Sequence, residues 1–221
     1  MSLNPIPADA ATVISWSMDE TRGHTMHDRT GTYNGTIQGG VILGVDGHRI
    51  DDGGRWHRGH HRDDDRAYKF TGDGDVVVVP HASALNPGSA RFSVSIYFKS
   101  YTKPSSVGAD SFDLARKGLS TTAGGDWKLE VRPNGRVFCH FRGARSVDLL
   151  GTSNVVDGSW NKVECTKSSS GVRLRVNGST EASSDADPGR VSNRAPLTVG
   201  AKSASSDGTV GRLDALTLRK G

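Results

Sequence analysis

The sequence is poor in the residue types that build long helices and membrane spans. Of its 221 residues, three are methionine and only 34% are hydrophobic. No stretch of eleven or more residues keeps an apolar period of 3.6, so little or no helix is expected. No apolar run approaches the roughly 20 residues that a helix needs to cross a bilayer. Membrane insertion is therefore not expected.

The chain also lacks a cluster of charge of one sign. Its formal net charge is +4, from 28 Lys and Arg residues against 24 Asp and Glu residues. The basic residues are scattered among the acidic ones, whereas nucleic-acid-binding proteins gather them on one face. Nucleic acid is not expected as a partner. Cysteine is rare as well, and the two residues, Cys139 and Cys165, lack the C-x-x-C spacing of a zinc site.

Glycine, by contrast, is abundant, with 28 residues. Between these turn signals lie short segments in which apolar and polar residues alternate, the pattern of strands with one buried face. Residues 92–98 alternate in this way. In residues 157–178, a polar turn, two strands and a closing Asn177-Gly178 turn signal predict an antiparallel hairpin. The length suits one all-β domain, with no linker or repeat that would divide it.

Four blocks of this sequence resemble the laminin G-like family. They are residues 16–36, 67–80, 157–178 and 211–218. The third is similar to the family hairpin D-G-x-W-H-x-V…V-x-L-x-V-D-G, with Asn161 and Asn177 in place of its histidine and aspartate. The first is similar to the opening W-x-M/F-D-E-x-x-G…D-x-S/T-G-x-x-N-x-G-T. The others resemble L-x-F-D-G-x-D-D-Y-V-x-V-P and the final strand G-x-I-D-x-V-x-I.

The resemblance implies a two-sheet antiparallel β-sandwich, a concanavalin A-like jelly roll, over residues 11–220. Residues 1–10 are expected to form a flexible N-terminal segment. Residues 44–66 are rich in charge and glycine without periodicity, and we expect a long charged loop there, since loops of that length are unusual unless functional or mobile. Tryptophans 16, 127 and 160 are expected to be structural.

In a jelly roll, the strands that carry Cys139 and Cys165 lie near each other, and both side chains are expected to point inward. A disulfide is the favoured interpretation, and two separate buried thiols are the alternative. A disulfide would indicate an oxidising compartment.

The resemblance also implies a structural calcium ion between the N-terminal loop and the last strand. The matching positions are Asp28, the carbonyl groups around Gly31 and Asn34, and Asp214, with Glu20 as a substitute ligand. Carboxylate and carbonyl oxygens are the ligands that Ca²⁺ prefers. The alternative is that Asp28 caps a turn and that Asp214 pairs with an arginine.

Catalytic residues are not predicted. The chain has four glutamates, Glu20, Glu130, Glu164 and Glu181, and none has the E-x-D-x-x-E spacing of the jelly-roll glucanases. Glycoside hydrolysis needs two carboxyl groups flanking the scissile bond. Glu130 and Glu164 are expected to be solvated on outward faces of strands. The motifs of the jelly-roll alginate lyases are missing as well.

Carbohydrate binding would rest on exposed aromatic rings that stack on sugar faces. Trp56 and Tyr101 lie in predicted loops, and Arg55 and Arg58 beside Trp56 suit an anionic sugar. The sequence therefore predicts a non-catalytic carbohydrate-binding or adhesion module, monomeric, extracellular or displayed at a cell surface, with a polysaccharide or glycan as its partner. The alternatives are a polysaccharide lyase or glycoside hydrolase on the same fold, and a structural module of a larger surface assembly.

Overall fold

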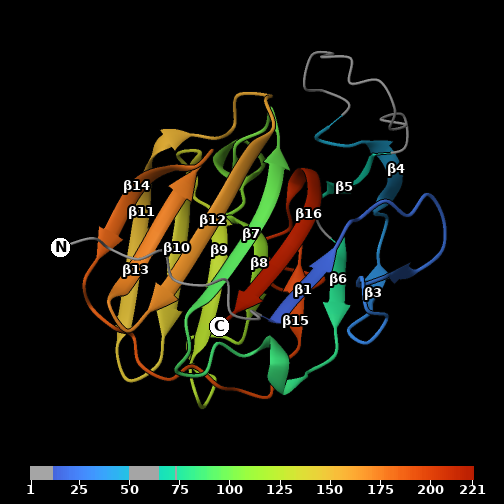
Figure 1. The fold of residues 1–221 in the computed structure, drawn as a ribbon. Coiled ribbons are helices and arrows are strands. Elements are labelled where there is room, and N and C mark those ends of the chain that lie inside the picture. Colours follow the sequence, from blue (N-terminus) through green and yellow to red (C-terminus); the bar gives the residue numbers. More distant parts are fainter. Residues whose placement is uncertain (1–11, 50–64, 73) are drawn as a thin grey trace, which may run out of the picture.

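The computed structural model describes residues 12–49, 65–72 and 74–221. They form two antiparallel sheets packed face to face (Figure 1). Sheet A, toward the viewer in Figure 1, contains in spatial order β14 (Ser179–Ser184), β13 (Gly171–Val176), β12 (Asn161–Ser168), β7 (Phe92–Lys99), β16 (Val210–Lys220), β5 (Arg66–Thr71) and β4 (Ile42–Asp46), and β1 (Thr12–Trp16) pairs with β16.

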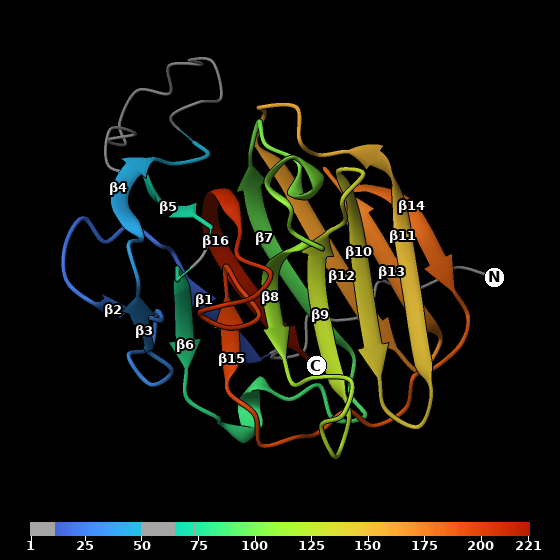
Figure 2. The ribbon, with the colours of Figure 1, turned by 180° about the vertical axis from the view of Figure 1, so that it is seen from behind.

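Sheet B faces the viewer in Figure 2. Its strands, in spatial order, are β11 (Ser146–Asn154), β10 (Arg136–Arg142), β9 (Asp126–Val131), β8 (Phe112–Lys117), β15 (Leu197–Val199), β6 (Val76–Val79), β3 (Gly35–Gln38) and β2 (Thr25–Met26). Short 3₁₀ turns at Ser83–Leu85 and Pro104–Val107 are the helical elements of the described residues. The predicted two-sheet antiparallel sandwich with little helix is confirmed.

The core lies between the sheets and follows the alternation seen in the sequence. On β10, Val137, Cys139 and Phe141 point inward and are fully buried, while their neighbours point outward. Cys165 on β12 is equally buried and forms a disulfide with Cys139, with the two Cα atoms 6.1 Å apart. The predicted disulfide is thus present. It joins sheet A to sheet B through the middle of the sandwich.

Two of the three tryptophans expected to be structural are core residues, since Trp16 and Trp127 have no exposed surface. Trp160 differs. Asn161 points inward at the start of β12, so the residue before it points to the outer side of sheet A. There the half-buried indole of Trp160 lies under the Lys99 Nζ atom, 5.9 Å from the ring centre. Trp160 is therefore not a core residue, because strand parity places its ring on the outer face of sheet A.

The structure describes both ends of the predicted charged loop 44–66. Its first residues belong to β4, and Arg66 begins β5. His48 is buried and stacks on the Tyr97 ring at 3.7 Å between ring centres, so charge and glycine content did not indicate exposure at this position. Residues 50–64, together with the N-terminal segment 1–10, lie outside the described residues.

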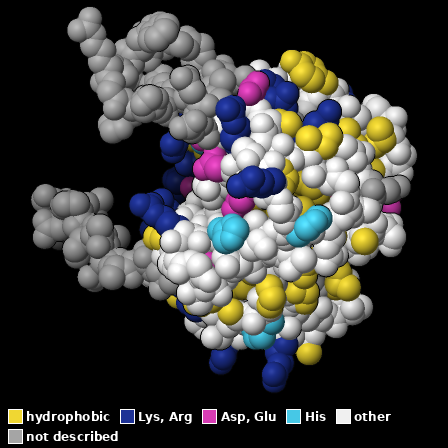
Figure 3. Space-filling model, turned by 90° about the vertical axis from the view of Figure 1, so that its right-hand side faces the viewer, with side chains coloured by type: hydrophobic (Ala, Val, Ile, Leu, Met, Phe, Trp, Pro, Cys, Tyr) yellow, Lys and Arg dark blue, Asp and Glu magenta, His cyan; other side chains and the backbone are white. Residues whose placement is uncertain are grey.

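Figure 3 views the side of the molecule that carries β2 to β5. Basic side chains lie beside acidic ones there, and hydrophobic side chains form separate small patches. No helix in the described ranges is long and apolar enough to cross a membrane.

Candidate functional site

A row of four polar side chains crosses the outer face of sheet B. The strand registers place Arg116 of β8, Lys128 of β9, His140 of β10 and Asp148 of β11 directly beside one another. Side chains on one face of neighbouring strands at matched positions are in contact range. The residues between them point inward and are buried: Trp127, Leu129, Val131, Val137, Cys139 and Phe141. The apolar core residues of these strands therefore fix the polar row on the opposite face.

A second row runs one step further along the same strands. It contains Asp113 of β8, Glu130 of β9 and Phe138 of β10. Phe138 is half-buried, and the guanidinium of Arg132 lies over its ring at 4.0 Å from the ring centre. Lys128 approaches the same ring at 5.2 Å. The Phe138 ring thus forms an apolar surface between two cationic side chains, which we call the Phe138 plate.

The first row and Phe138 of the second form the floor of a hollow of about 490 Å³. Pockets of this size suit small-molecule ligands. The rim comes from the loops that hold Leu119, Ser120 and Thr121 on one side and Lys202 and Asp207 on the other. The remaining lining residues are Arg116, Asp126, Lys128, Arg132, Phe138, His140 and Asp148. We call this hollow the sheet B groove.

The imidazole of His140 is clamped between two carboxylates. Its Nε2 atom lies 3.1 Å from Asp126 Oδ2 and its Nδ1 atom 2.5 Å from Asp148 Oδ1. Because both ring nitrogens face oxygen acceptors, both must donate, which only the imidazolium does. Burial lowers the pKa of His140, but the hydrogen bonds to Asp126 and Asp148 outweigh burial, and the pKa is raised. The two carboxylates therefore favour the positively charged form of His140 in the groove floor.

Asp126 connects this clamp to the rim. Burial raises the pKa of the Asp126 carboxyl, but the hydrogen bonds and charges of His140 and Arg142 outweigh it, and the pKa is lowered. Arg142 Nε donates to Asp126 Oδ1 at 2.6 Å. The Nη2 atom of Arg142 donates to the carbonyl groups of Leu119 and Thr122. One carboxylate thus positions both the floor histidine and the rim loop.

The prediction that the Glu130 carboxylate is solvated was wrong. Glu130 points outward as expected, yet its side chain is 1% exposed instead of solvated. Lys128 Nζ donates to Glu130 Oε2 at 2.7 Å, and Arg132 Nε lies 3.0 Å from Oε1. The cations of neighbouring side chains fold over the carboxylate, which no local pattern of the sequence indicates.

Asp113, beside Glu130, is fully buried. Burial raises the pKa of Asp113 to about 7, and the nearby Glu130 carboxylate adds to the rise against the charge of Arg116. Arg116 Nη1 donates to Asp113 Oδ2 at 2.6 Å. Neither Asp113 nor Glu130 lines the groove. The pair lies beneath the layer of cations and not at its surface.

Of the predicted sugar-binding residues, the structure describes Tyr101. Tyr101 is 82% exposed, and its ring lies against Gly158, where a side chain would have no room. It does not line the groove. Arg55, Trp56 and Arg58 lie outside the described residues. The groove residues had one signal in the sequence, the polar residues that alternate with Trp127, Leu129 and Val131.

The predicted calcium ligands Asp28, Gly31 and Asn34 form one turn. Asp28 Oδ2 accepts hydrogen bonds from the backbone N–H and the hydroxyl of Thr30, and Oδ1 accepts one from the N–H of Tyr33. Asn34 Oδ1 accepts from the N–H of Asp28, and its amide donates to the Gly31 carbonyl. These hydrogen bonds agree with the alternative in which Asp28 caps a turn. They engage the side-chain oxygens of Asp28 and Asn34 within that turn.

Asp214 belongs to a different cluster. Together with His48 and Asp65 it offers three ligand atoms that all lie within 4.8 Å of one another. Asp214 Oδ2 accepts from the backbone N–H of His48 at 2.9 Å and lies 2.7 Å from its Nδ1 atom. Asp214 thus pairs with a histidine and not with an arginine. Its Oδ1 atom is buried without a hydrogen-bond partner among the described residues.

Glu20, the substitute ligand, lies in a third set of contacts. It accepts hydrogen bonds from the N–H of His27 at 2.8 Å and from the Tyr68 hydroxyl. Among the described residues, the metal-ligand group therefore includes Asp214 but not Asp28 or Glu20. The calcium ion stays a prediction.

Comparison with known families agrees with this architecture. Residues 70–220 match the laminin G family described as concanavalin A-like lectin/glucanases superfamily. The protein belongs to this superfamily. No characterised protein sequence matches the chain significantly.

Several solved structures are similar to this chain in fold. Domain 4 of AbnA, a GH43 extracellular arabinanase from Geobacillus stearothermophilus in complex with arabinotriose, has a TM-score of 0.62 and 18% identity, and the match covers 96% of this chain and 93% of that one. The binding domain of Paraclostridial Mosquitocidal Protein 1 has a TM-score of 0.68 and 14% identity, with 94% and 48% covered.

The receptor binding domain of botulinum neurotoxin D has a TM-score of 0.60 and 14% identity, and the match covers 93% of this chain and 48% of that one. This chain therefore spans about half the length of the two toxin domains and nearly all of the arabinanase domain. At these identities the similarity concerns the fold.

Proposed function

We propose that this protein is a non-catalytic module that binds carbohydrate in the sheet B groove. One observation carries the proposal: the row of Arg116, Lys128, His140 and Asp148 beside the Phe138 plate, at the bottom of a hollow of about 490 Å³. Sugars present hydroxyl groups around a ring with apolar C–H faces. A ring plate next to fixed donors and acceptors matches both parts of such a ligand.

The polar groups of the groove are held in place before any ligand arrives. Asp126 and Asp148 fix the His140 ring, and Glu130 fixes Lys128 and Arg132. Ordering of side chains costs affinity when it happens on binding, so a preformed arrangement favours binding. The similar fold of the arabinanase domain, solved with arabinotriose, supports a sugar as the ligand.

The geometry favours binding over hydrolysis. A glycosidase needs a protonated carboxyl group at the scissile bond and a second carboxylate near it. The carboxylates that line the groove are held by cations: Asp126 by His140 and Arg142, Asp148 by His140, and Asp207 by Lys202. Asp113, with its raised pKa, is fully buried and does not line the groove.

Replacing Phe138 with alanine tests the site. We expect Phe138→Ala to weaken binding to the best glycan of an array about tenfold, or about 1.4 kcal/mol, measured by isothermal titration calorimetry. Tyr101→Ala is the matched control, because it removes an exposed aromatic ring outside the groove. The site would be wrong if Tyr101→Ala weakened binding and Phe138→Ala did not. Release of reducing ends or unsaturated products from the glycan would favour the enzyme alternative.

We also propose that a divalent cation binds at Asp214, on the opposite sheet. The buried Asp214 Oδ1 atom has no hydrogen-bond partner among the described residues, and such groups are rare and costly. Burial raises the pKa of Asp214, although the hydrogen bonds from His48 oppose the rise. A cation bound by Asp214 and Asp65 would give the buried Asp214 Oδ1 atom a positively charged partner. Carboxylates suit Ca²⁺, whereas the imidazole of His48 suits Zn²⁺.

The cation proposal predicts a metal-dependent melting temperature. At a hundredfold excess over its dissociation constant, Ca²⁺ is expected to raise Tm by about 5–10 °C in thermal-shift assays. EDTA reverses the rise, and Asp214→Asn removes it. A response to Zn²⁺ in place of Ca²⁺ would assign the site to the histidine chemistry. A Tm that no divalent cation changes would refute the proposal.

The disulfide supports an extracellular or cell-surface location, since such bonds persist in oxidising compartments. An adhesion role and a glycan-binding role both require such exposure to partners.

A further inference from the structure

A row of polar side chains also crosses the outer face of sheet A. The registers place Arg219 of β16, Ser93 of β7, Thr166 of β12, Arg173 of β13 and Ser183 of β14 side by side. Arginines therefore stand on both sides of two short hydroxyl side chains. Because Ser and Thr are much shorter than Arg, the middle of the row is a shallow trough with raised, positively charged sides.

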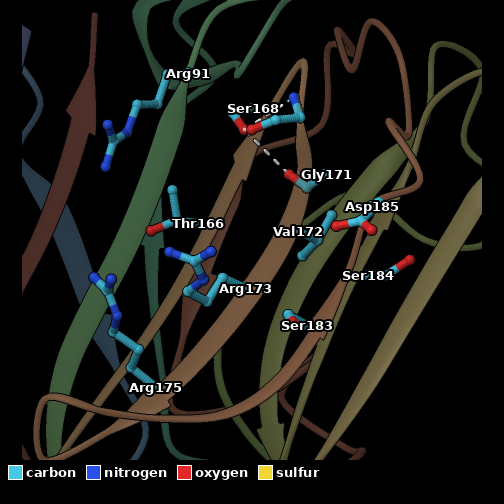
Figure 4. A pocket seen from close by; sticks show the side chains of 11 residues that line it. Arg91, Thr166, Ser168, Gly171, Val172, Arg173, Arg175, Ser183, Ser184 and Asp185 are labelled. Atoms are coloured by element: carbon cyan, nitrogen blue, oxygen red, sulfur yellow. Dashed lines mark hydrogen bonds between the residues drawn. The ribbon is translucent and has the colours of Figure 1, made fainter. Parts of the chain in front are cut away.

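A hollow of about 140 Å³ lies at one end of this trough (Figure 4). Arg91, Arg173 and Arg175 contribute their side chains to it, together with the hydroxyl residues Thr166 and Ser168. In Figure 4 the three arginine side chains lie around Thr166, one coming from the segment before β7 and two from β13. Two segments far apart in sequence thus bring three guanidinium groups to one place.

Most of this positive charge is not neutralised by the protein. Arg175 Nη1 lies 3.3 Å from Glu164 Oε1. Among the described residues, Arg91 and Arg173 have no ion pair or side-chain hydrogen bond, and both are exposed. Asp185, at the edge of the hollow, is the acidic lining residue and makes no ion pair with a described residue. Two forks of N–H donors are therefore available to a ligand.

Guanidinium groups recognise oxyanions by paired hydrogen bonds, and hydroxyl groups supply further donors. We propose that the hollow between Arg91, Arg173 and Arg175 binds a sulfate or carboxylate group of an acidic polysaccharide. It is a second site, on the sheet opposite the sheet B groove, and does not depend on the groove being a sugar site.

The lining selects the class of ligand. It contains no aromatic ring on which a nucleic-acid base would stack, although stacking is the usual platform for single strands. Its single large apolar side chain, Val172, is buried, so nothing there would anchor the face in a lipid bilayer. Acidic polysaccharides need neither feature. They carry oxyanions along a polymer chain, and this chain can lie along the Ser93–Thr166 trough.

The test is binding of a sulfated and a uronic acid polysaccharide, each against an uncharged polysaccharide, by calorimetry or surface plasmon resonance at 50 and 200 mM salt. We expect the acidic polymers to bind, more weakly at high salt, and Arg173→Gln to weaken binding about tenfold or more. The polymer that binds more tightly identifies the oxyanion as sulfate or carboxylate. Asp185→Asn should strengthen binding severalfold, because it removes from the edge of the hollow a negative charge that repels the acidic polymer.

Arg136→Gln is the matched control, since it removes an exposed arginine from sheet B with the same change in net charge. Equal losses in Arg136→Gln and Arg173→Gln would reduce the effect to net charge and overturn the site. Preference for an oligonucleotide or for anionic vesicles would overturn the ligand class. Phe138→Ala should leave this binding unchanged, so failure of the groove proposal and failure of this one are distinguishable.

Discussion

Replacing Cys139 and Cys165 together with alanine is expected to lower the free energy of unfolding by about 3.5 kcal/mol. The bond closes a loop of 26 residues, and in the chain-entropy model a loop of that length restricts the unfolded chain by about this amount. For a domain of this size the loss corresponds to a fall in Tm of about 7–14 °C. Urea denaturation followed by tryptophan fluorescence measures the change.

The position of the bond adds to the expected effect. Both sulfurs lie in the core between the sheets, so the double substitution also leaves a small cavity. Unfolding the wild type in reductant separates the two contributions, because reduction removes the crosslink and leaves the sulfur atoms. Two free thiols titrated in the native, non-reduced protein would contradict the prediction, as would a urea midpoint that reductant does not change.

The sheets of this fold could be predicted from the sequence because their determinants are local. Alternation along residues 92–98 and 136–142 defines an inner face wherever a strand forms. The family blocks then gave the order of the strands. Parity likewise determines that Trp160, one residue before the inward-pointing Asn161, lies on the outer face. That outcome was within reach of the sequence alone.

The groove and the cation cluster could not be predicted in the same way, because their contacts join distant residues. His48 is buried because it binds Asp214, 166 residues further along the chain, and stacks on Tyr97. Glu130 is buried because the cations of Lys128, on its own strand, and of Arg132, directly after that strand, cover it. Burial of a polar residue depends on the partners that tertiary structure supplies, and composition does not identify those partners.

Asp126→Asn is expected to destabilise the protein by about 3 kcal/mol at pH 5 and by clearly less at pH 9. The substitution keeps the size of the side chain but removes the negative charge that faces His140 at 3.1 Å and Arg142 at 2.6 Å. Removal of one partner from a buried ion pair costs about 3–5 kcal/mol. Because the asparagine still accepts one hydrogen bond, we expect a loss at the lower end of this range.

The pH dependence follows from the directions of the two pKa shifts. The lowered pKa of Asp126 means that its stabilising contribution is present above the ordinary carboxyl pKa of about 4 and is lost as pH falls through the lowered value. The raised pKa of His140 means that its contribution is complete below about pH 6.5 and is lost as pH rises through the raised value. The pair therefore stabilises most between about pH 4 and 6.5, and Arg142 alone remains above.

Two measurements check this result. Urea denaturation at pH 5, 7 and 9 gives the stability difference, and NMR titration of the His140 ring should show a lower pKa in Asp126→Asn than in the wild type. Asp148→Asn is the matched control, since it removes the same charge from the other ring nitrogen at a half-exposed side chain and should cost less than about 1 kcal/mol. Equal losses at pH 5 and pH 9 would contradict the prediction, because they would mean that the charge of His140 does not change between these pH values, and the NMR titration would then show which form the ring keeps. A ring that stayed neutral would present an uncharged imidazole to the ligand of the sheet B groove.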